Sequence, residues 1–513
     1  MIVIGQHVRD STAYPGENPP RWLGGARAQR ASNYHWGMQS VTAALARLGD
    51  LAASPTVSRL ANSFAQAGFE LALVGGPVRD AFLDRVTNDL DFTTNATPDQ
   101  ILTIVKPIAE AYWDIGRAFG TIGAQIAGEK VEITTYRADS YDGQTRRPDV
   151  VFGSSLDDDL LRRDFTVNAL ALRLPQITLV DPSNGIDDLL NGILRTPTAP
   201  EISFGDDPLR MMRAARFTAQ LGFSLDIDTA IAMSAMAGSI NIISAERVGD
   251  ELGKLLRAAN PRAGIELLVE SGLAAIVLPE IPALRLEIDE HHHHKDVYQH
   301  TLTVLDQAIG YERTRKNLTE PDLVVRLAAL MHDIGKPATR RLESGGVVSF
   351  YHHDVVGAKL AKKRLRALRF DNDTIAAVGK LVELHLRFFG YTEGAWTDSA
   401  VRRYVRDAGD QLERLHILTR ADVTTRNRRK ADRLGFAYDD LEQRISELAA
   451  QEEMDSVRPD LDGEQIMAIL ELTPGREVGE AYRYLLEQRL DDGPLGTEEA
   501  TRRLQSWWAA RGA

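Results

Sequence analysis

Two aspartates in the first fifth of the chain have the spacing of a metal-binding pair. Asp89-Leu90-Asp91 lies in a run with strand character, so the two-residue period of a strand places both carboxylates on one face. Such acids repel each other, and the pair persists most readily with a divalent cation between them. Glu132, in the strand-like run Val131-Glu132-Ile133, is a candidate third carboxylate. An exposed acidic edge without a metal is the alternative interpretation.

A glycine pair precedes these acids. Residues 71–74 are typical of a buried strand, which ends at Gly75-Gly76, and the helix start that follows carries Arg79. Backbone N–H groups at such a turn can approach a phosphate chain, and Arg79 adds positive charge. A glycine turn for a triphosphate beside an Asp-x-Asp pair for Mg²⁺ is the minimum equipment for in-line nucleotidyl transfer, in which metal ions activate a hydroxyl and neutralise pyrophosphate.

Further along the chain, charged residues recur every three positions at Asp207, Arg210, Arg213 and Arg216. On a helix this spacing forms one ladder on one side. An internal ladder of salt bridges is one interpretation, and contact with a nucleotide is the other.

The histidines indicate a second centre. Nine of the twelve lie between residues 291 and 385, and the chain has no cysteine, so any metal must be held by histidine and carboxylate. The run from His291 to His294 is expected to be a solvated loop.

The length of 513 residues predicts about three or four domains. Apolar residues make up 43% and charged residues 26%, which is typical of a soluble globular protein. Neither a bilayer-length apolar run nor a signal sequence is present, so we expect a cytoplasmic protein without a membrane partner.

The net charge of −13 is unevenly distributed. Residues 301–450 hold 26 Lys and Arg against 21 Asp and Glu, whereas the remainder holds 34 against 52. Within the first group, residues 359–369 carry six cations and no acid, and Arg428, Arg429 and Lys430 belong to a second basic stretch. A solvated helix face and a contact with a phosphate backbone are both consistent with the first stretch.

Hydrophobic periodicity places these residues on elements. Strands are expected at 71–74 and 90–94, and a hairpin from 121–126 and 131–136. One or two helices are expected within 41–68, and nearly all of the chain after 208 has helical period, for example at 208–221, 246–258, 298–311, 323–333, 355–369 and 373–388. The predicted class is therefore α+β, a small mixed-sheet head followed by a long all-helical body.

Five blocks of the chain resemble the class II tRNA nucleotidyltransferase and bacterial poly(A) polymerase family. They are Gly75-Gly76-Pro77-Val78-Arg79-Asp80 with Asp89-Leu90-Asp91, Arg162-Arg163-Asp164-Phe165-Thr166-Val167-Asn168-Ala169, Asp181-Pro182-Ser183-Asn184-Gly185, Asp206-Asp207-Pro208-Leu209-Arg210-Met211-Met212-Arg213-Ala214-Ala215-Arg216-Phe217, and Glu246-Arg247-Val248 with Glu251-Leu252. The resemblance covers about residues 60–280 and implies a polymerase beta-like head. Asp206 stands where the family usually carries glutamate.

The resemblance implies roles for individual residues. Asp89 and Asp91 would hold Mg²⁺, Arg163 would contact phosphate, and Asp164 would contact the ribose hydroxyls. Asp207 and Arg210 would present one acceptor and one donor to the base of the incoming nucleotide. Arg213 and Arg216 would face the triphosphate.

The histidine-rich region resembles the HD phosphohydrolase superfamily through His332-Asp333, with a histidine one helix earlier and an aspartate several helices later. By this resemblance the core metal ligands would be His300, His332, Asp333 and Asp422, with His353 and His385 as candidates for a second metal. The ion would be a divalent transition metal, and the activity would be a phosphodiesterase or phosphatase on RNA 3′ ends. A fold without a working metal site is the alternative.

We therefore expect an extension at 1–40 without stable structure, a nucleotidyltransferase head at 41–195, a helical neck at 196–285, an HD-type domain at 286–450 and a helical tail at 451–513. The predicted function is template-independent addition of CCA to tRNA 3′ ends, with CTP and ATP as donors and tRNA as partner. Three alternatives remain open: a poly(A) polymerase, a protein whose main activity is the HD site, and a non-catalytic RNA-binding scaffold.

Overall fold

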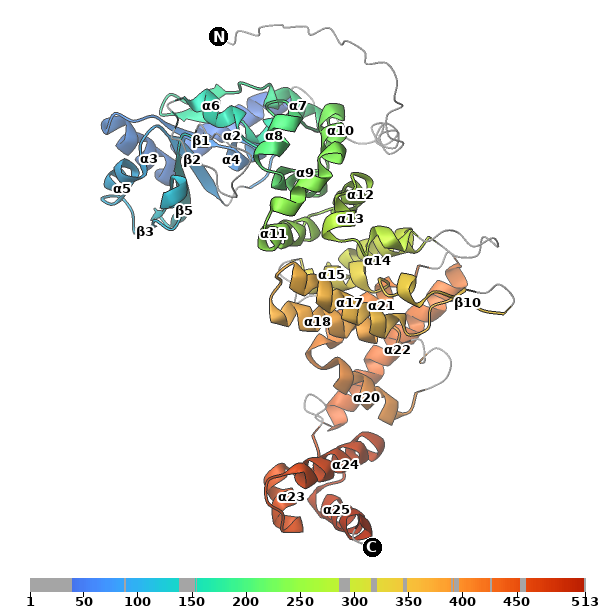
Figure 1. The fold of residues 1–513 in the computed structure, drawn as a ribbon. Helices are drawn as coiled ribbons and strands as arrows, with labels where there is room; N and C mark the ends of the chain where they lie inside the picture. Colours follow the sequence, from blue (N-terminus) through green and yellow to red (C-terminus); the bar gives the residue numbers. More distant parts are fainter. Residues whose placement is uncertain are drawn as a thin grey trace. The chain divides into compact units, whose positions relative to one another are not determined.

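The computed structural model describes residues 39–86, 89–137, 153, 155–285, 296–314, 321–344, 348–388, 391, 396–424, 427–452 and 458–511 (Figure 1). The chain divides into two compact units; among the described residues, the first unit ends at Pro197 and the second begins at Thr198. The predicted extension at 1–40 lies almost entirely outside the described residues, as does the run from His291 to His294.

The first unit is built on a seven-stranded sheet in the order β3-β4-β5-β2-β1-β6-β7. Its strands are β1 Leu71–Val74, β2 Leu90–Thr94, β3 Ala111–Trp113, β4 Thr121–Ile126, β5 Glu129–Thr135, β6 Ala171–Leu174 and β7 Thr178–Val180. Strands β2 and β5 pair in parallel and the other neighbours pair antiparallel. The predicted strands and the predicted hairpin are confirmed, and β3, β6 and β7 are additional.

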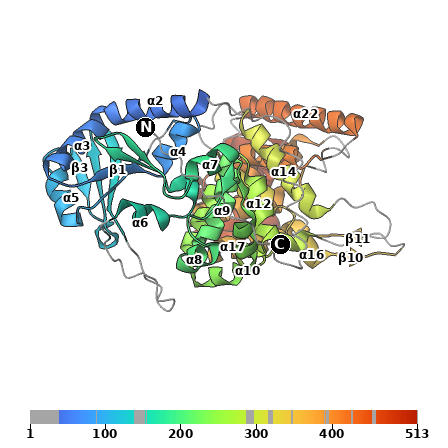
Figure 2. The same ribbon diagram turned by 90° about the horizontal axis from the view of Figure 1, so that it is seen from above.

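The helices described in this unit are α2 Gln39–Ala53, α3 Pro55–Gln66, α4 Gly76–Phe82, α5 Pro98–Val105, α6 Leu156–Leu161 and α7 Gly185–Asn191. Of these, α3, α4, α5 and α6 contact the sheet. Figure 2 shows α2 beside α4, with which it is in contact. On one face of the sheet, Leu156 and Leu160 of α6 pack against Ala72 and Val74 of β1. Because Ala72 pairs with Thr93 in the register, α6 lies on the face that carries the odd-numbered residues of β2.

The second unit begins with neck helices. They are α8 Pro200–Asp206, α9 Leu209–Leu221, α10 Ile227–Ala235, α11 Ala245–Leu256, α12 Pro261–Glu270 and α13 Leu273–Val277. Helix α9 packs on α11 and α12. A buried ion pair joins this neck to the helices that follow: the Arg326 guanidinium contacts Glu312 (2.9 Å) and donates to the Leu256 carbonyl (2.6 Å) at the end of α11.

In the part of the second unit after the neck that the structure describes, the elements are helices and the hairpin of β10 Arg341–Leu342 and β11 Val348–Ser349. The body helices are α14 Val297–Glu312, α15 Leu323–Met331, α16 Lys336–Thr339, α17 His353–Ala367, α18 Asn372–Leu384, α20 Asp398–Ala408, α21 Leu412–Ala421 and α22 Arg428–Glu452. The predicted helices are confirmed with ends displaced by at most about four residues, which is close to the ordinary uncertainty of helix boundaries.

Three tail helices complete the chain: α23 Gly463–Leu470, α24 Arg476–Asp492 and α25 Thr497–Arg511. They enclose a small core around Ile466, Leu485 and Leu504. Helix α24 packs on α20, where the buried Arg402 donates to the Leu490 carbonyl (3.1 Å). Among the helices that the structure describes, none combines the length and the apolarity that a bilayer crossing requires.

Candidate active sites

The three predicted carboxylates of the head meet on one face of the sheet. Asp91 of β2 and Glu132 of β5 are direct partners in the parallel register, and Asp89 immediately precedes β2. Burial, and then repulsion from Glu132 and Asp89, raise the pKa of Asp91 to about 6, although the guanidinium of Arg163 opposes this shift. The donor set consists of carboxylate oxygens whose charges repel one another, and it fits a hard divalent cation.

The glycine turn lies close to Arg163, which is beside this face. Gly75 adopts a backbone conformation that residues with a side chain rarely adopt. Its φ of 71° is in the left-handed region, and its N–H donates to the Leu170 carbonyl (3.1 Å). A Cβ at this position would lie 3.3 Å from Arg163 Nη1. The absence of a side chain therefore lets the turn and the Arg163 guanidinium approach each other.

Arg163 is positioned by a residue to which the sequence analysis gave no role. Asp159 of α6 is fully buried, and its carboxylate pairs with Arg163 (3.1 Å) and Arg162 (2.8 Å). It also accepts from Thr93 Oγ1 (3.3 Å), which is two residues from Asp91 on the same strand face. Burial raises the pKa of Asp159, but the two guanidinium groups outweigh burial and hold it below its usual range. This ion pair fixes positive charge beside the acidic face.

The remaining head residues form a buried chain of hydrogen bonds. Arg79 Nη1 donates to Asn168 Oδ1 (2.6 Å), and Asn168 Nδ2 donates to Asp164 Oδ1 (3.0 Å). Arg79 also pairs with Asp80 (2.8 Å). The arrangement ties the helix after the glycine turn to the segment that carries Asp164. The contacts of Arg79 with phosphate and of Asp164 with ribose stay predictions.

In the second unit, Asp207 and Arg210 are both held by neighbouring side chains. Asp207 Oδ1 accepts from the Leu209 N–H (3.1 Å), and Oδ2 accepts from Arg247 Nη2 of α11 (2.9 Å). Arg210 Nη1 donates to Ser203 Oγ of α8 (2.7 Å). Helix α11 thus orients the acceptor, Asp207, and helix α8 orients the donor, Arg210.

The other two members of the ladder turn toward Glu251 of α11. Arg216 Nε lies 2.6 Å and Arg213 Nη1 3.6 Å from its carboxylate. Arg216 also covers the ring of Phe217, with 4.1 Å between its guanidinium carbon and the ring centroid. These contacts agree with the interpretation as a salt-bridge ladder, and contact of Arg213 and Arg216 with a triphosphate stays a prediction.

The six predicted ligands of the body converge in two groups, His300, His332 and Asp422, and Asp333, His353 and His385. Within each group the potential ligand atoms lie within 4.8 Å of one another. His332, His385 and Asp422 each follow the last residue of a helix, so α15, α18 and α21 point their carboxyl ends at one centre.

Asp333 connects the two groups. Its Oδ2 lies 3.2 Å from His332 Nε2, and its Oδ1 lies 3.3 Å from His353 Nε2. On the other side, Asp422 Oδ1 lies 3.0 Å from His300 Nε2. Asp333 therefore directs one carboxylate oxygen toward each group and would be available to an ion held by either.

Backbone carbonyls set the orientation of the imidazoles. The Nδ1 atoms of His332, His353 and His385 each donate to the carbonyl three residues earlier, at 2.9, 2.8 and 2.6 Å. A carbonyl only accepts, so Nδ1 carries a proton, and in the neutral ring Nε2 has a lone pair directed at the cluster. Burial and the neighbouring His332 lower the pKa of His385 to about 4, so its ring is neutral at pH 7. Neutral imidazole and carboxylate together fit a divalent transition metal.

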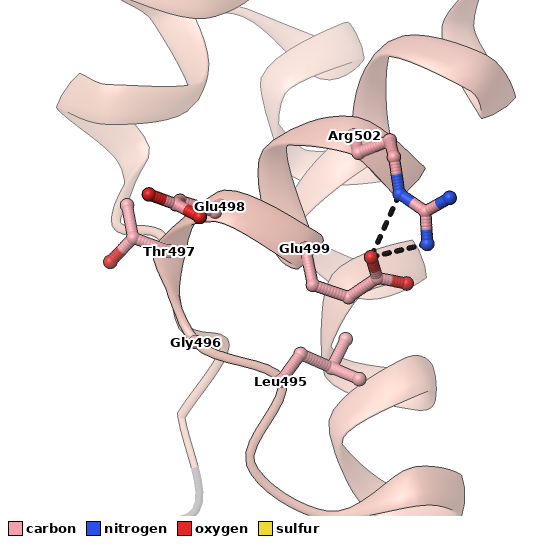
Figure 3. Close-up of a pocket in the computed structure, with 6 residues that line it drawn as sticks. All are labelled: Leu495, Gly496, Thr497, Glu498, Glu499 and Arg502. Atoms are coloured by element: carbon pink, nitrogen blue, oxygen red, sulfur yellow. Dashed lines mark hydrogen bonds and ion pairs between the residues drawn. The ribbon is translucent and has the colours of Figure 1, made fainter.

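A pocket of about 480 Å³ lies apart from these sites, at the start of α25 (Figure 3). It is lined by Leu495, Gly496, Thr497, Glu498, Glu499 and Arg502. Arg502 Nε donates to Glu499 Oε2 (2.8 Å), so two of its charged groups satisfy each other. None of the residues predicted to do chemistry lies in it.

Three family models match the chain. Residues 71–195 match the poly A polymerase head domain, residues 222–284 the probable RNA and SrmB-binding site of polymerase A, and residues 297–427 the HD domain.

Individual relatives match as well. An A-adding tRNA nucleotidyltransferase of Deinococcus radiodurans is 36% identical over 446 residues, which are 85% of this chain and 95% of the relative. A CCA-adding enzyme of Lactobacillus helveticus is 43% identical over 209 residues, but these are only 40% of this chain and 51% of that relative. The structure of the Bacillus stearothermophilus CCA-adding enzyme in complex with CTP has a TM-score of 0.64 at 24% identity, covers 90% of this chain and 99% of its own, and shows the same fold.

Proposed function

We infer that this chain, which belongs to the tRNA nucleotidyltransferase family, adds CCA to the 3′ ends of tRNA with CTP and ATP as donors. The observation that carries this proposal is the convergence of Asp89, Asp91 and Glu132 on one sheet face beside the Gly75 turn. It is supported by the relative that matches most of the chain, whose name gives tRNA as its substrate.

The chain's own residues divide the reaction between them. Asp89 and Asp91 are proposed to hold Mg²⁺, which, when bound, would activate the RNA 3′-hydroxyl and neutralise the departing pyrophosphate. The Gly75 N–H is bonded to the Leu170 carbonyl, so the backbone N–H groups proposed to face the triphosphate are those that follow Gly75 in the turn, and Arg163, fixed by Asp159, adds positive charge. Glu132 contributes negative charge beside the pair, which strengthens its hold on a cation.

Asp207 and Arg210 are proposed to select the base. An acceptor and a donor can pair with cytosine or with adenine if the side chains reorient, whereas guanine and uracil leave buried groups unpaired. Arg247 and Ser203 hold the two side chains, so the protein supplies the template.

Addition of A alone is a second candidate, favoured by one observation. The A-adding relative matches 85% of this chain, whereas the CCA-adding relative from Lactobacillus helveticus matches 40%. The chain spans only about half the length of that second relative.

Primer extension distinguishes the candidates. The substrates are one tRNA transcript that lacks its last three nucleotides and one that lacks only the terminal A, each with CTP, ATP or both. CCA addition predicts two residues with CTP and three with both on the first transcript. A-only addition predicts one residue with ATP on the second transcript alone, and a lengthening ladder with ATP on any RNA would indicate a poly(A) polymerase. No incorporation anywhere would contradict the proposal.

The body is proposed to hydrolyse a phosphate ester at an RNA 3′ end, such as a 2′,3′-cyclic phosphate. His300, His332, Asp333 and Asp422 would hold a divalent transition metal, which would polarise the phosphate and supply the attacking hydroxide. The buried Nε2 atoms directed at the cluster support this proposal.

Hydrolysis of an RNA with a 2′,3′-cyclic phosphate end, with Mn²⁺, Ni²⁺ or Co²⁺ added, tests this second activity. The matched control is His332→Gln, which removes one ligand from the body and leaves the head unchanged. Equal hydrolysis by both proteins, or none by the wild type with any of these metals, would contradict a working site.

A further inference from the structure

Helix α17 carries five cations and no acid from Lys359 onward, and these cations fall into two sets. The inward set is already paired: Arg364 contacts Glu280 (2.9 Å), and Lys362 lies along α18, where its stem fills the space over Gly379. The ammonium group of Lys362 reaches Glu383 at 4.0 Å. These side chains attach α17 to its neighbours.

The outward set consists of Lys359, Lys363 and Arg366. All three are exposed, and their spacing of four and three residues places them on one face of the helix, one turn apart. Among the described residues, no carboxylate lies within ion-pair distance of any of them. We call Lys359, Lys363 and Arg366 the basic face of α17.

The C-terminal end of α17, which follows the basic face, contacts the neck. The Cβ that Gly249 of α11 lacks would lie 2.3 Å from the Leu368 carbonyl, so α11 and the end of α17 are in close contact. Arg369 reaches Glu246 of α11 at 3.7 Å, and Glu280 receives Arg364. Glu246, Gly249 and Glu280 all lie in the segment 222–284 that matches the probable RNA-binding model.

We propose that the basic face of α17 binds the phosphate backbone of tRNA and continues the RNA-binding surface of the neck. A chain with a net charge of −13 repels a polyanion except where cations gather unpaired. Between Lys359 and Arg369 the exposed residues are four cations and Ala367, and the exposed Val355 precedes the face by one turn. A single valine is a small anchor for a membrane or for the core of a protein interface, so the face favours a polyanion. This inference rests on the proposed action on tRNA.

The test is tRNA binding by the full-length protein across a salt series. The triple variant Lys359→Gln, Lys363→Gln, Arg366→Gln removes the charges and avoids an acid near the helix C-terminus. Three lost phosphate contacts should lower the slope of log K against log salt by about two to three, and affinity at physiological salt by roughly tenfold or more. Extension at saturating tRNA should keep its kcat, because these residues lie outside the proposed active site.

The matched control is Arg429→Gln, Lys430→Gln, Arg433→Gln, which removes three exposed cations from α22. This control should bind tRNA within about twofold of the wild type. Unchanged affinity and slope in the α17 variant, or an equal loss in the α22 control, would overturn the proposal. A wild type that extends no tRNA would instead contradict the proposed function, so the two failures are distinguishable.

Discussion

The head and the body each gather carboxylates, but they balance the charge in opposite ways. In the head, burial and the neighbouring Glu132 raise the pKa of Asp91 to about 6. In the body, burial also disfavours the charged form of Asp422, but the hydrogen bond from His300, together with the nearby His332 and His385, outweighs burial and lowers the pKa of that carboxyl to about 2. Repulsion between neighbouring carboxylates therefore dominates around Asp91 in the head. In the body, neighbouring histidines stabilise the charged form of Asp422.

This difference indicates two kinds of metal site. The head offers only oxygen ligands, and Asp89 and Glu132 are exposed, so an ion could enter and leave with the nucleotide. The body offers buried imidazoles fixed by backbone carbonyls, which suits an ion that remains bound. We therefore expect the head to exchange its ion and the body to retain one.

The largest expected effect comes from removing one carboxylate of the head, which should nearly abolish nucleotide addition and leave hydrolysis by the body intact. Asp89→Asn should lower kcat for nucleotide addition by about 10³-fold or more, equivalent to about 4 kcal/mol, because the cation loses a ligand. Binding of tRNA and hydrolysis by the body should be unchanged. The comparison fails if Asp89→Asn alters hydrolysis, or if His332→Gln lowers nucleotide addition by more than about twofold.

Metal retention is the next effect in size. After gel filtration in metal-free buffer, the body should keep Mn²⁺, Co²⁺ or Ni²⁺, whereas Mg²⁺ should be lost from the head, a difference in affinity of roughly 100-fold or more. Metal analysis of the eluted protein measures this. His385→Gln removes a ligand from the group around Asp333 and should lower the metal content by about one ion if that group holds one. Full loss of metal from the wild type would show that the body also exchanges its ion.

The head pair could be predicted from the period of a strand, and the grouping of the body residues from a family resemblance. Alternation along β2 predicted that Asp89 and Asp91 share a face, and the position of Glu132 in a neighbouring strand is confirmed by the register. The ligand set of the body was predicted from the resemblance of the region around His332-Asp333 to the HD phosphohydrolase superfamily, and the structure brings these residues together in two groups. In the head, local strand geometry fixes the direction of the side chains.

Residues whose role depends on tertiary packing were missed. Asp159 is one of three consecutive aspartates, and only the packing of α6 on the sheet determines that it points inward to Arg163. Likewise Lys362 and Lys363 are adjacent in one basic run, and the contact of α17 with α18 decides which one is turned inward. The periodicity of the sequence does not show which of these adjacent residues points inward.

The smallest expected effect concerns stability without metal, where the two sites should respond with opposite sign. Because the pKa of Asp91 is raised in the folded state, the folded protein binds more protons than the unfolded chain between about pH 4 and 6, and stability falls as pH rises through this range. Asp91→Asn should therefore raise stability in chelator above pH 6 by on the order of 2 kcal/mol and have little effect near pH 4.

Because the pKa of Asp422 is lowered, its carboxylate contributes stability above about pH 4, and Asp422→Asn should lower stability at pH 7 by on the order of 2 kcal/mol. Thermal melts in chelator at several pH values measure both changes, and a loss of stability in both variants at pH 7 would show that the head carboxylates are balanced as well as those of the body.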